Sequence, residues 1–271
     1  MRVKAKIIGT GGIALCLIDP LCRLLNYGSS AYSFDEVDVA LIDGDEFEER
    51  NKPRQKFGDR GNKAEVTKQR LEEEFFDINF RAHPAYVDEG NIGMFIGDGD
   101  VVFLCVDNHK TRKLVSIYCQ EELDNITLIN GGNNSHDGNV MLYLKRDGVD
   151  LTLPLHTAKD QDGKVYHPEI LNPPEGDLHP NEEPEDREGC LEQQADDPQL
   201  LVANNMAAAW MLATFHGVLN GSVPEKKDDD GNVISEAASV FVDPKYAPFF
   251  KYDETQFDIR NGAAVPQRRT K

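Results

Sequence analysis

The first residues whose spacing points to chemistry are Gly9, Gly11 and Gly12, which directly follow the apolar residues 3–8. Glycines let a backbone turn tightly from a strand into a helix and approach a phosphate, whose charge the free N–H groups of the helix N-terminus stabilise. Ala14 stands where the dinucleotide-binding fingerprint has a further glycine. The turn by itself is therefore equally compatible with nucleotide binding and with a tight connection.

Charged residues farther along the chain separate two kinds of nucleotide chemistry. Asp43 ends a second apolar stretch, where a carboxylate can accept hydrogen bonds from ribose in an NAD enzyme or an ATP enzyme. Arg54 and Lys63 follow, and cations near the phosphates serve ATP cleavage, because charge shifts among phosphate oxygens during attack. Asp107, at the end of another apolar stretch, is a natural ligand for Mg²⁺, which prefers oxygen ligands shared with phosphate. The pattern predicts ATP chemistry.

Four motifs together give the chain a resemblance to a known family. In chain order they are Gly9-x-Gly11-Gly12, Asp43-x-Asp45, Asn51-x-x-Arg54-Gln55 and Asp107-Asn108-x-x-x-Arg112. As a set they resemble the ThiF/MoeB family, which includes the adenylation domains of ubiquitin-activating enzymes. The resemblance covers residues 2–145 well and the helical stretch 201–219 more loosely.

The resemblance implies ATP-dependent adenylation of the C-terminal glycine of a small ubiquitin-like or sulfur-carrier protein of the β-grasp fold. Asp43 is then expected to hold the ribose and Asp107 the Mg²⁺, while Arg54 and Lys63 contact the phosphates. Arg54 and Asp107 are the expected catalytic residues of this step. The full ATP site implied by the resemblance consists of Gly9, Gly11, Gly12, Asp43, Asp45, Asn51, Arg54, Gln55, Lys63, Asp107, Asn108 and Arg112.

Two details of this assignment stay open. The phosphate lysine is Lys63 or the nearby Lys68, and either could instead lie on the solvated face of a surface helix. Family members often form homodimers in which a helix before the first strand lends an arginine to the partner subunit's site. This chain begins directly with the predicted strand, so Arg2 or Arg268 is the expected substitute if an arginine is supplied at all.

Cys190 is the candidate for a second step, because many family members pass the adenylate to a cysteine in a loop above the nucleotide site, forming a thioester. Gly189 leaves its sulfur accessible, and a nearby helix N-terminus favours the thiolate. Eleven acidic residues and one basic residue lie between positions 169 and 197, which raises the pKa of that thiol. The alternative is a chance surface cysteine. This acidic stretch is where a basic ubiquitin-like protein would be steered, with a conjugating-enzyme-like carrier downstream.

Alternating strand and helix patterns must position these residues. Short β-branched and apolar stretches predict strands at 3–8, 37–42, 79–82, 100–106, 126–130, 139–145 and 239–242. Apolar residues at helical spacing predict helices at 12–27, 63–76, 108–123 and 199–219. Short hydrophobic strands joined by helices predict an α/β protein with a Rossmann-like, doubly wound, mostly parallel sheet covered by helices on both faces.

The chain is predicted to form a single domain, residues 1–271. Residues 147–197 lose the periodicity and gather proline, glycine and acidic residues, which predicts a long acidic crossover loop. Residues 221–271 are predicted to hold a C-terminal strand and a tail, with the basic residues 267–271 loosely held.

Composition excludes several function classes. The 29 Lys and Arg against 48 Asp and Glu give a net charge of −19, which argues against nucleic acid or an anionic membrane as the main partner. Apolar stretches fall short of the roughly 20 residues of a membrane span, and no secretory signal opens the chain, so a cytoplasmic location is expected.

The five cysteines contain no CxxC pair, so no structural zinc is expected. Four of them are predicted to be core residues: Cys16, Cys22, Cys105 and Cys119. The histidines at 136, 156, 167 and 179 lack metal-ligand spacing and receive no role.

Two other functions stay open beside adenylation. An NAD-dependent oxidoreductase would share the glycine turn and Asp43. A non-catalytic, adenylation-like scaffold would dock partners through its acidic face, but the retention of Arg54, Lys63 and Asp107 argues against a decayed site. Within the adenylation class, a bacterial ubiquitin-like conjugation system fits at least as well as thiamin or molybdopterin sulfur transfer.

Overall fold

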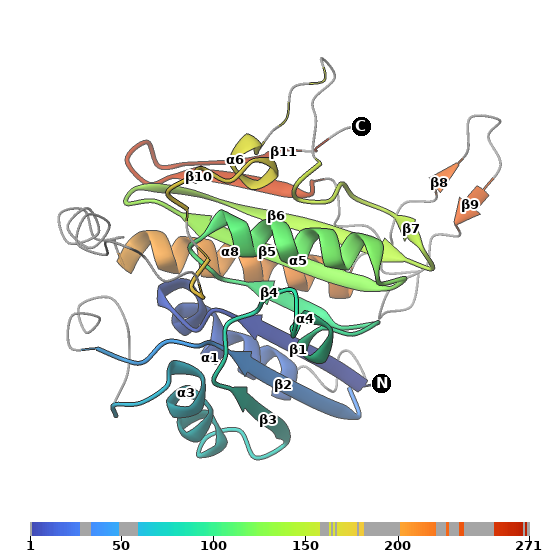
Figure 1. Cartoon of the computed structure of the whole chain (residues 1–271). Helices are drawn as coiled ribbons and strands as arrows, with labels where there is room; N and C mark the ends of the chain where they lie inside the picture. The colour runs from blue at the N-terminus through green and yellow to red at the C-terminus, as the bar shows by residue number, and fades with distance from the viewer. Residues whose placement is uncertain are drawn as a thin grey trace.

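One mixed sheet runs through the part of the chain that the computed structural model describes, which is residues 2–27, 34–48, 59–157, 163, 165, 167–177, 179–181, 201–220, 226–227, 233–235, 252–267 and 269. Its nine strands are β1 (Arg2–Ile8), β2 (Glu36–Ile42), β3 (Ile78–His83), β4 (Val101–Leu104), β5 (Ile126–Asn133), β6 (Asp137–Arg146), β7 (Val149–Asp150), β10 (Glu254–Asp258) and β11 (Ala263–Gln267). They lie in the order β11-β10-β6-β5-β4-β1-β2-β3, with β7 beside β6 (Figure 1).

The sheet has a parallel half and an antiparallel half. Strands β3, β2, β1, β4 and β5 pair in parallel, whereas β6, β7, β10 and β11 pair antiparallel to their neighbours. The chain moves outward from β1 to β2 and β3 on one side, and through β4 to β5 on the other. The carboxyl ends of β1 and β4 therefore flank the point where the strand order reverses, which is where open α/β sheets bind ligands.

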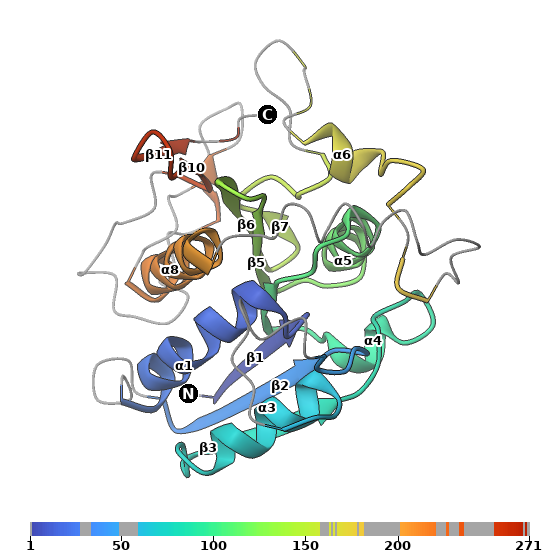
Figure 2. The ribbon, with the colours of Figure 1, turned by 90° about the vertical axis from the view of Figure 1, so that its left-hand side faces the viewer.

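Helices cover both faces of the sheet, and Figure 2 shows α1 and α8 on one side and α5 on the other. The first face carries α1 (Gly12–Tyr27), α3 (Lys63–Glu72) and α8 (Leu201–Asn220), and the second carries α4 (Ile92–Phe95), α5 (His109–Glu121) and α6 (Pro168–Leu171). The predicted α/β class, a Rossmann-like sheet covered on both faces, is confirmed. A two-stranded ribbon, β8 (Lys226–Lys227) and β9 (Val233–Ser235), is separate from this sheet.

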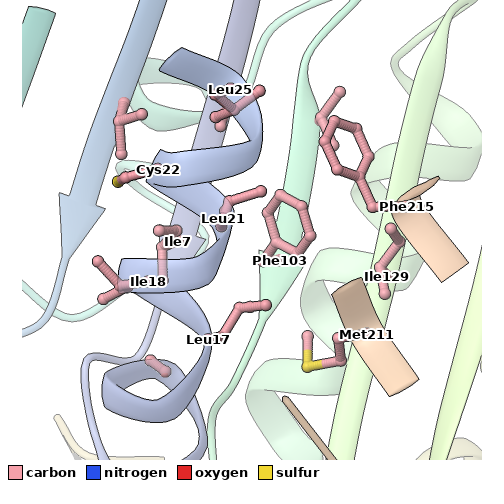
Figure 3. Packing of buried hydrophobic residues seen from close by; sticks show 14 of the residues in the cluster. Ile7, Leu17, Ile18, Leu21, Cys22, Leu25, Phe103, Ile129, Met211 and Phe215 are labelled. Atoms are coloured by element: carbon pink, nitrogen blue, oxygen red, sulfur yellow. The ribbon is translucent and has the colours of Figure 1, made fainter. Parts of the chain in front are cut away.

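The larger hydrophobic core lies under α1 and α8, as Figure 3 shows. Helix α1 presents Leu17 and Leu21 to it, both fully buried, because apolar residues recur at helical spacing along that helix. Phe103 of β4 packs edge-on against Phe215 of α8, with ring centroids 5.3 Å apart. This contact joins α8, which is distant in sequence, to β4, and the same core packs α8 against α1 beside the glycine turn.

Several element boundaries differ from the predicted ones. The helix predicted at 63–76 ends at Glu72, and α4, α6, β7, β10 and β11 were not predicted. Strand β7 and helix α6 fall inside residues 147–197, which were predicted to be one long loop. The predicted strand at 239–242 and residues 182–197 lie outside the described residues.

The prediction that residues 267–271 are loosely held is wrong at Gln267 and Arg269. Gln267 pairs with Glu254 in the β10–β11 hairpin. The Arg269 side chain is fully buried, and its guanidinium donates a 2.5 Å hydrogen bond to the Leu142 carbonyl of β6. Its ion-pair partners, Asp253 and Glu254, come from the same hairpin. Within the described part of the chain, no helix is both long and apolar enough to cross a membrane.

Candidate functional site

The glycine turn joins three strands at the reversal point. The Gly9 N–H donates to the Ile42 carbonyl of β2 at 2.9 Å. Gly9 has φ +84°, and a Cβ there would stand 3.0 Å from the carbonyl carbon and oxygen of Cys105, directly after β4. Only glycine adopts this backbone conformation without strain while approaching another backbone so closely. The turn after β1 therefore lies against the segment that leads into Asp107.

Asp43 closes this turn from the carboxyl end of β2. Its Oδ2 accepts hydrogen bonds from the Thr10 N–H at 2.5 Å and the Thr10 hydroxyl at 3.0 Å, and its Oδ1 accepts from the Asp45 N–H at 2.8 Å. Burial raises the pKa of the Asp43 carboxyl, against the nearby charge of Lys63, which lowers it. A carboxylate has about four lone-pair sites, so Asp43 retains capacity to accept a hydroxyl.

Lys63 begins α3 beside the two aspartates, whereas Lys68 does not. The buried Lys63 Nζ lies 2.7 Å from Asp45 Oδ2, and the Tyr86 hydroxyl donates to the other oxygen of that carboxylate. Lys68 instead pairs with Glu72 one turn along α3, at 2.7 Å. Between the two candidate lysines, only Lys63 lies with Asp43 and Asp45.

Asn62 fixes the start of α3 and ties it to β2. Its side-chain oxygen accepts the N–H groups of Ala64 and Glu65, as an N-cap does, and its amide nitrogen donates to the Asp43 and Asp45 carbonyls. Helix α3, and with it Lys63, is thereby held against the end of β2.

Asp107, Asn108 and Arg112 lie together after β4. Asp107 is exposed, and Asn108 caps α5 by accepting the Thr111 N–H at 2.8 Å. The Arg112 guanidinium is 8% exposed and donates to the Val106 carbonyl at 2.8 Å. Burial lowers the pKa of Arg112, and the charges of Asp107 and Asp177 oppose that effect.

Asn204 of α8 was not predicted to belong to the site. It is fully buried, and its Nδ2 has no hydrogen-bond partner among the described residues, while its Oδ1 accepts from Asn133 at 3.1 Å. A Cβ at Gly12 would stand only 2.5 Å from that Nδ2, so an orphaned donor lies at the beginning of α1. A polar residue inside the apolar helix of residues 201–220 is the sequence signal that could have revealed it.

Other unassigned groups occupy the α5 face of the sheet. Asn130 of β5 is fully buried, and within the described part of the chain neither its side-chain oxygen nor its side-chain nitrogen has a hydrogen-bond partner. His167, which sequence reasoning gave no role, lies between Glu169 and Glu254, with Nδ1 3.1 Å and Nε2 2.9 Å from their oxygens. Burial alone would lower its pKa, but the two carboxylates outweigh burial and raise the pKa to about 9.

Some predicted residues cannot be placed in this arrangement. Asn51, Arg54, Gln55, Cys190 and Arg268 lie outside the described residues. Arg2 stands at the amino end of β1, at the opposite end of the strand from Gly9, and pairs with Asp38 and Glu36.

The predicted core cysteines are confirmed: Cys22, Cys105 and Cys119 are buried, and Cys16 is partly buried. Burial raises the pKa of the Cys22 and Cys105 thiols to about 12, so these two are poor nucleophiles at neutral pH.

The donor set fits a nucleotide phosphate better than a protein-only metal centre. Among the described residues, no three His, Cys, Asp or Glu side chains are grouped so that they could hold a metal ion. A magnesium ion in nucleotide sites needs only one or two carboxylates, with phosphate oxygens and water completing its shell, and the exposed Asp107 can supply one. The orphaned Asn204 amide beside Gly12 is a donor suited to a phosphate oxygen.

Comparisons with known proteins agree with this geometry. The model of the ThiF family matches residues 2–227. A crystal structure of Escherichia coli MccB aligns with 98% of this chain at 19% identity and a TM-score of 0.61, and one with ATP aligns with 99% at 17% and 0.63. A structure of the microcin C7 biosynthetic enzyme MccB in complex with N-formylated MccA aligns with 99% at 17% and 0.61. The chain spans 62%, 64% and 65% of those three chains. None of the curated proteins matches it.

Proposed function

Because this chain belongs to the ThiF family, we propose that it is an ATP-dependent adenylyltransferase acting on the C-terminal carboxylate of a small protein or peptide. The family resemblance expected from the four sequence motifs is thereby confirmed. One observation carries the proposal: where the strand order reverses between β1 and β4, the glycine turn contacts both Asp43, which lies beside Lys63 and Asp45, and the segment after β4 that leads into Asp107. A structure of MccB with ATP, a protein of the same fold, supports the choice of nucleotide.

Each described residue of the site has a proposed task. The glycine turn and the Asn204 amide bind phosphate oxygens, and Asp43 accepts a ribose hydroxyl with its remaining lone-pair capacity. Lys63 supplies a compact positive charge to the phosphates, with Asp45 holding its amine in place. Asp107 would hold Mg²⁺, which neutralises charge on the phosphates. Arg54 keeps its proposed role at the phosphates, and Asn51 and Gln55 are proposed to help position ATP.

The proposed reaction is a displacement at the α-phosphorus. An oxygen of the substrate carboxylate forms a bond to that phosphorus, the bond from phosphorus to the bridging oxygen of pyrophosphate breaks, and the electron pair leaves with pyrophosphate. The products are an acyl adenylate and pyrophosphate. Negative charge moves onto the departing oxygens, so cations placed before the reaction lower its barrier.

Two substrate classes compete within this proposal. The family resemblance favours a β-grasp, ubiquitin-like or sulfur-carrier protein, and the acidic residues between 169 and 197 would attract a basic partner of that kind. The structure of MccB with N-formylated MccA favours a short peptide. A homodimer in which one subunit contributes an arginine to the other also stays part of the proposal.

Thioester formation on Cys190 is a further proposed step. The thiolate would attack the acyl carbon of the adenylate and release AMP, giving a thioester for a downstream carrier. Because the Cys22 and Cys105 thiols have a pKa of about 12, they do not compete for this role. We expect a reductant-sensitive adduct in the native protein and none in Cys190→Ala, with Cys16→Ala as the control. An undiminished adduct in Cys190→Ala would move the thioester elsewhere.

Pyrophosphate exchange tests the adenylation itself. With ATP, Mg²⁺ and a panel of β-grasp proteins and short peptides with free C-termini, labelled pyrophosphate should enter ATP. Asp107→Ala should abolish this exchange, because it removes the proposed Mg²⁺ ligand. Asp77→Ala, which removes an exposed carboxylate before β3, is the matched control and should leave exchange unchanged. Exchange that persists undiminished in Asp107→Ala would refute the assignment.

A further inference from the structure

The amino end of α5 already binds a carboxylate. Asp177, which follows α6 in sequence, places its Oδ2 2.7 Å from the His109 nitrogen and 2.9 Å from the Lys110 nitrogen, and both N–H groups donate to it. These groups belong to the first turn of α5, where backbone N–H groups lack partners inside the helix. The helix dipole adds a favourable term for negative charge there. Asn108, as the N-cap, accepts one backbone N–H of this turn, and Asp177, far away in sequence, accepts two more.

Unsatisfied buried donors behind this helix end point to a ligand. Arg112 is more than nine-tenths buried, its guanidinium donates to the Val106 backbone carbonyl, and its Nε has no partner among the described residues. Its guanidinium lies over Gly132, where a Cβ would come within 2.9 Å of it. Asn130, on the same face of β5, has an unpartnered amide and is fully buried. A buried donor without a partner is destabilising, so the two donors on this face of β5, Arg112 Nε and Asn130 Nδ2, favour a bound oxygen ligand.

This position is adjacent to the proposed nucleotide site. Gly9 approaches the Cys105 backbone within 3.0 Å, and only Val106, Asp107 and Asn108 separate that contact from His109. A carboxylate at the amino end of α5 therefore lies one short segment away from both the glycine turn and the proposed Mg²⁺ ligand. An acyl substrate must place its carboxylate in this neighbourhood to be adenylated.

We propose that the amino end of α5, together with Arg112, is the docking subsite for the substrate's C-terminal carboxylate, and that Asp177 fills it until the substrate displaces it. The inference rests on the proposed adenylation. It names the chemistry of the acceptor, a peptide-like chain ending in a free carboxylate. It also gives the segment around α6 a role, because displacement of Asp177 releases that segment from α5.

The competing explanation is that Asp177 is a helix cap and nothing more. A cap stabilises α5 in both cases, so loss of stability in Asp177→Ala does not distinguish the two. Only a docking subsite accepts a carboxylate from solution once Asp177 has been removed. Chemical rescue therefore separates the explanations.

N-acetylglycine is the probe, because it carries a free carboxylate next to a peptide bond. Asp177→Ala should melt a few degrees below the native protein, and N-acetylglycine should restore most of that loss. N-acetylglycinamide, which lacks the carboxylate, should restore nothing at matched ionic strength. Glu175→Ala, which removes an exposed carboxylate from the same segment, is the control and should show no rescue. The double variant Asp177→Ala with Arg112→Gln should lose the rescue.

The inference is wrong if N-acetylglycine stabilises the native protein and Asp177→Ala equally, or if the amide acts as well as the acid. If Asp177→Ala does not fold, Asp177→Asn replaces it, since its neutral amide oxygen can still accept both N–H groups. N-acetylglycine should then bind Asp177→Asn at least several-fold more tightly than the native protein, and equal affinity would refute the subsite.

The rescue requires no ATP, so it fails independently of the proposed function. Rescue without pyrophosphate exchange on any C-terminus would refute adenylation and leave the carboxylate site. Pyrophosphate exchange without rescue by N-acetylglycine would refute the carboxylate subsite and leave the proposed adenylation in place. Where exchange is found, Asp177→Ala should lower the KM of the acyl substrate several-fold and leave the KM of ATP unchanged, which loss of a simple cap would not do.

Discussion

The two halves of the sheet use polar side chains differently. In the parallel half they stand at the carboxyl ends of strands, and some keep unsatisfied atoms, as Asn204 and Arg112 do. In the antiparallel half, charged groups are buried against one another: His167 with Glu254, and Arg269 with Asp253 and Glu254. Arg269 Nε and Glu254 Oε2 also lack a hydrogen bond, but these two opposite charges lie 3.9 Å from each other. The first arrangement leaves capacity for a ligand, and the second joins distant segments of the chain.

This difference predicts that ligand binding depends mainly on the parallel half of the sheet and that stability depends mainly on the antiparallel half. Buried ions that pair with each other hold the β10–β11 hairpin and α6 onto β6, so removing one partner leaves an uncompensated charge. Polar groups at the strand ends of the parallel half contribute little to the core. Variants in the antiparallel half should therefore unfold the protein more easily, and variants at the strand ends should change binding.

The largest expected effect is on stability, at Arg269. Arg269→Met removes a fully buried guanidinium, leaves Asp253 without its cation and leaves Glu254 with His167 alone, which should lower the free energy of unfolding by about 3–5 kcal/mol. Arg260→Met is the matched control, since that side chain is 60% exposed and solvent screens its ion pair with Asp258, so its loss should change the free energy of unfolding very little. Urea unfolding measures both variants. Equal losses of unfolding free energy in Arg269→Met and Arg260→Met would contradict the expectation that buried ion pairs stabilise the antiparallel half.

The next largest effect is the pH dependence of the free energy of unfolding, which His167 controls. The pKa of His167 is about 9 in the folded protein against an ordinary value of 6.5, so the unfolded chain releases this proton first as pH rises. The stabilisation is fully present below pH 6.5, declines between pH 6.5 and 9, and is absent above that range, an effect on the order of 3 kcal/mol. His167→Gln should flatten the profile of unfolding free energy in this window. A native profile that is already flat there would contradict the assignment.

The parts of the site that could be predicted from sequence are those encoded locally. The glycine turn, Asp43 and Asp107 each follow an apolar strand, so their place at one edge of a parallel sheet follows from the pattern alone. Asn108 and Lys63 were assigned through the family resemblance, with Lys68 left open beside Lys63, and each stands where a helical pattern begins. Local patterns also sufficed for the strands and the longer helices of the parallel half, but not for the four-residue helix α4.

The rest depends on contacts between distant segments. Asn204 meets Gly12, and Asp177 meets His109, only because α8 and the segment after α6 pack onto the sheet. Arg269 looked like part of a loose basic tail because its partners, Asp253 and Glu254, belong to a hairpin too short to give a clear strand pattern. Residues 147–197 contain a two-residue strand and a four-residue helix, which are below the length at which periodicity is informative.

The central claim is that ATP binds at the strand ends of the parallel half, and two neighbouring lysines test it most directly. Calorimetric titration of ATP into Lys63→Met should show a dissociation constant at least about tenfold higher than in the native protein, a loss of about 1.4 kcal/mol. Lys68→Met should bind ATP as the native protein does, because Lys68 pairs with Glu72 on α3. Equal effects of the two substitutions, or tighter binding of NAD than of ATP, would contradict the account.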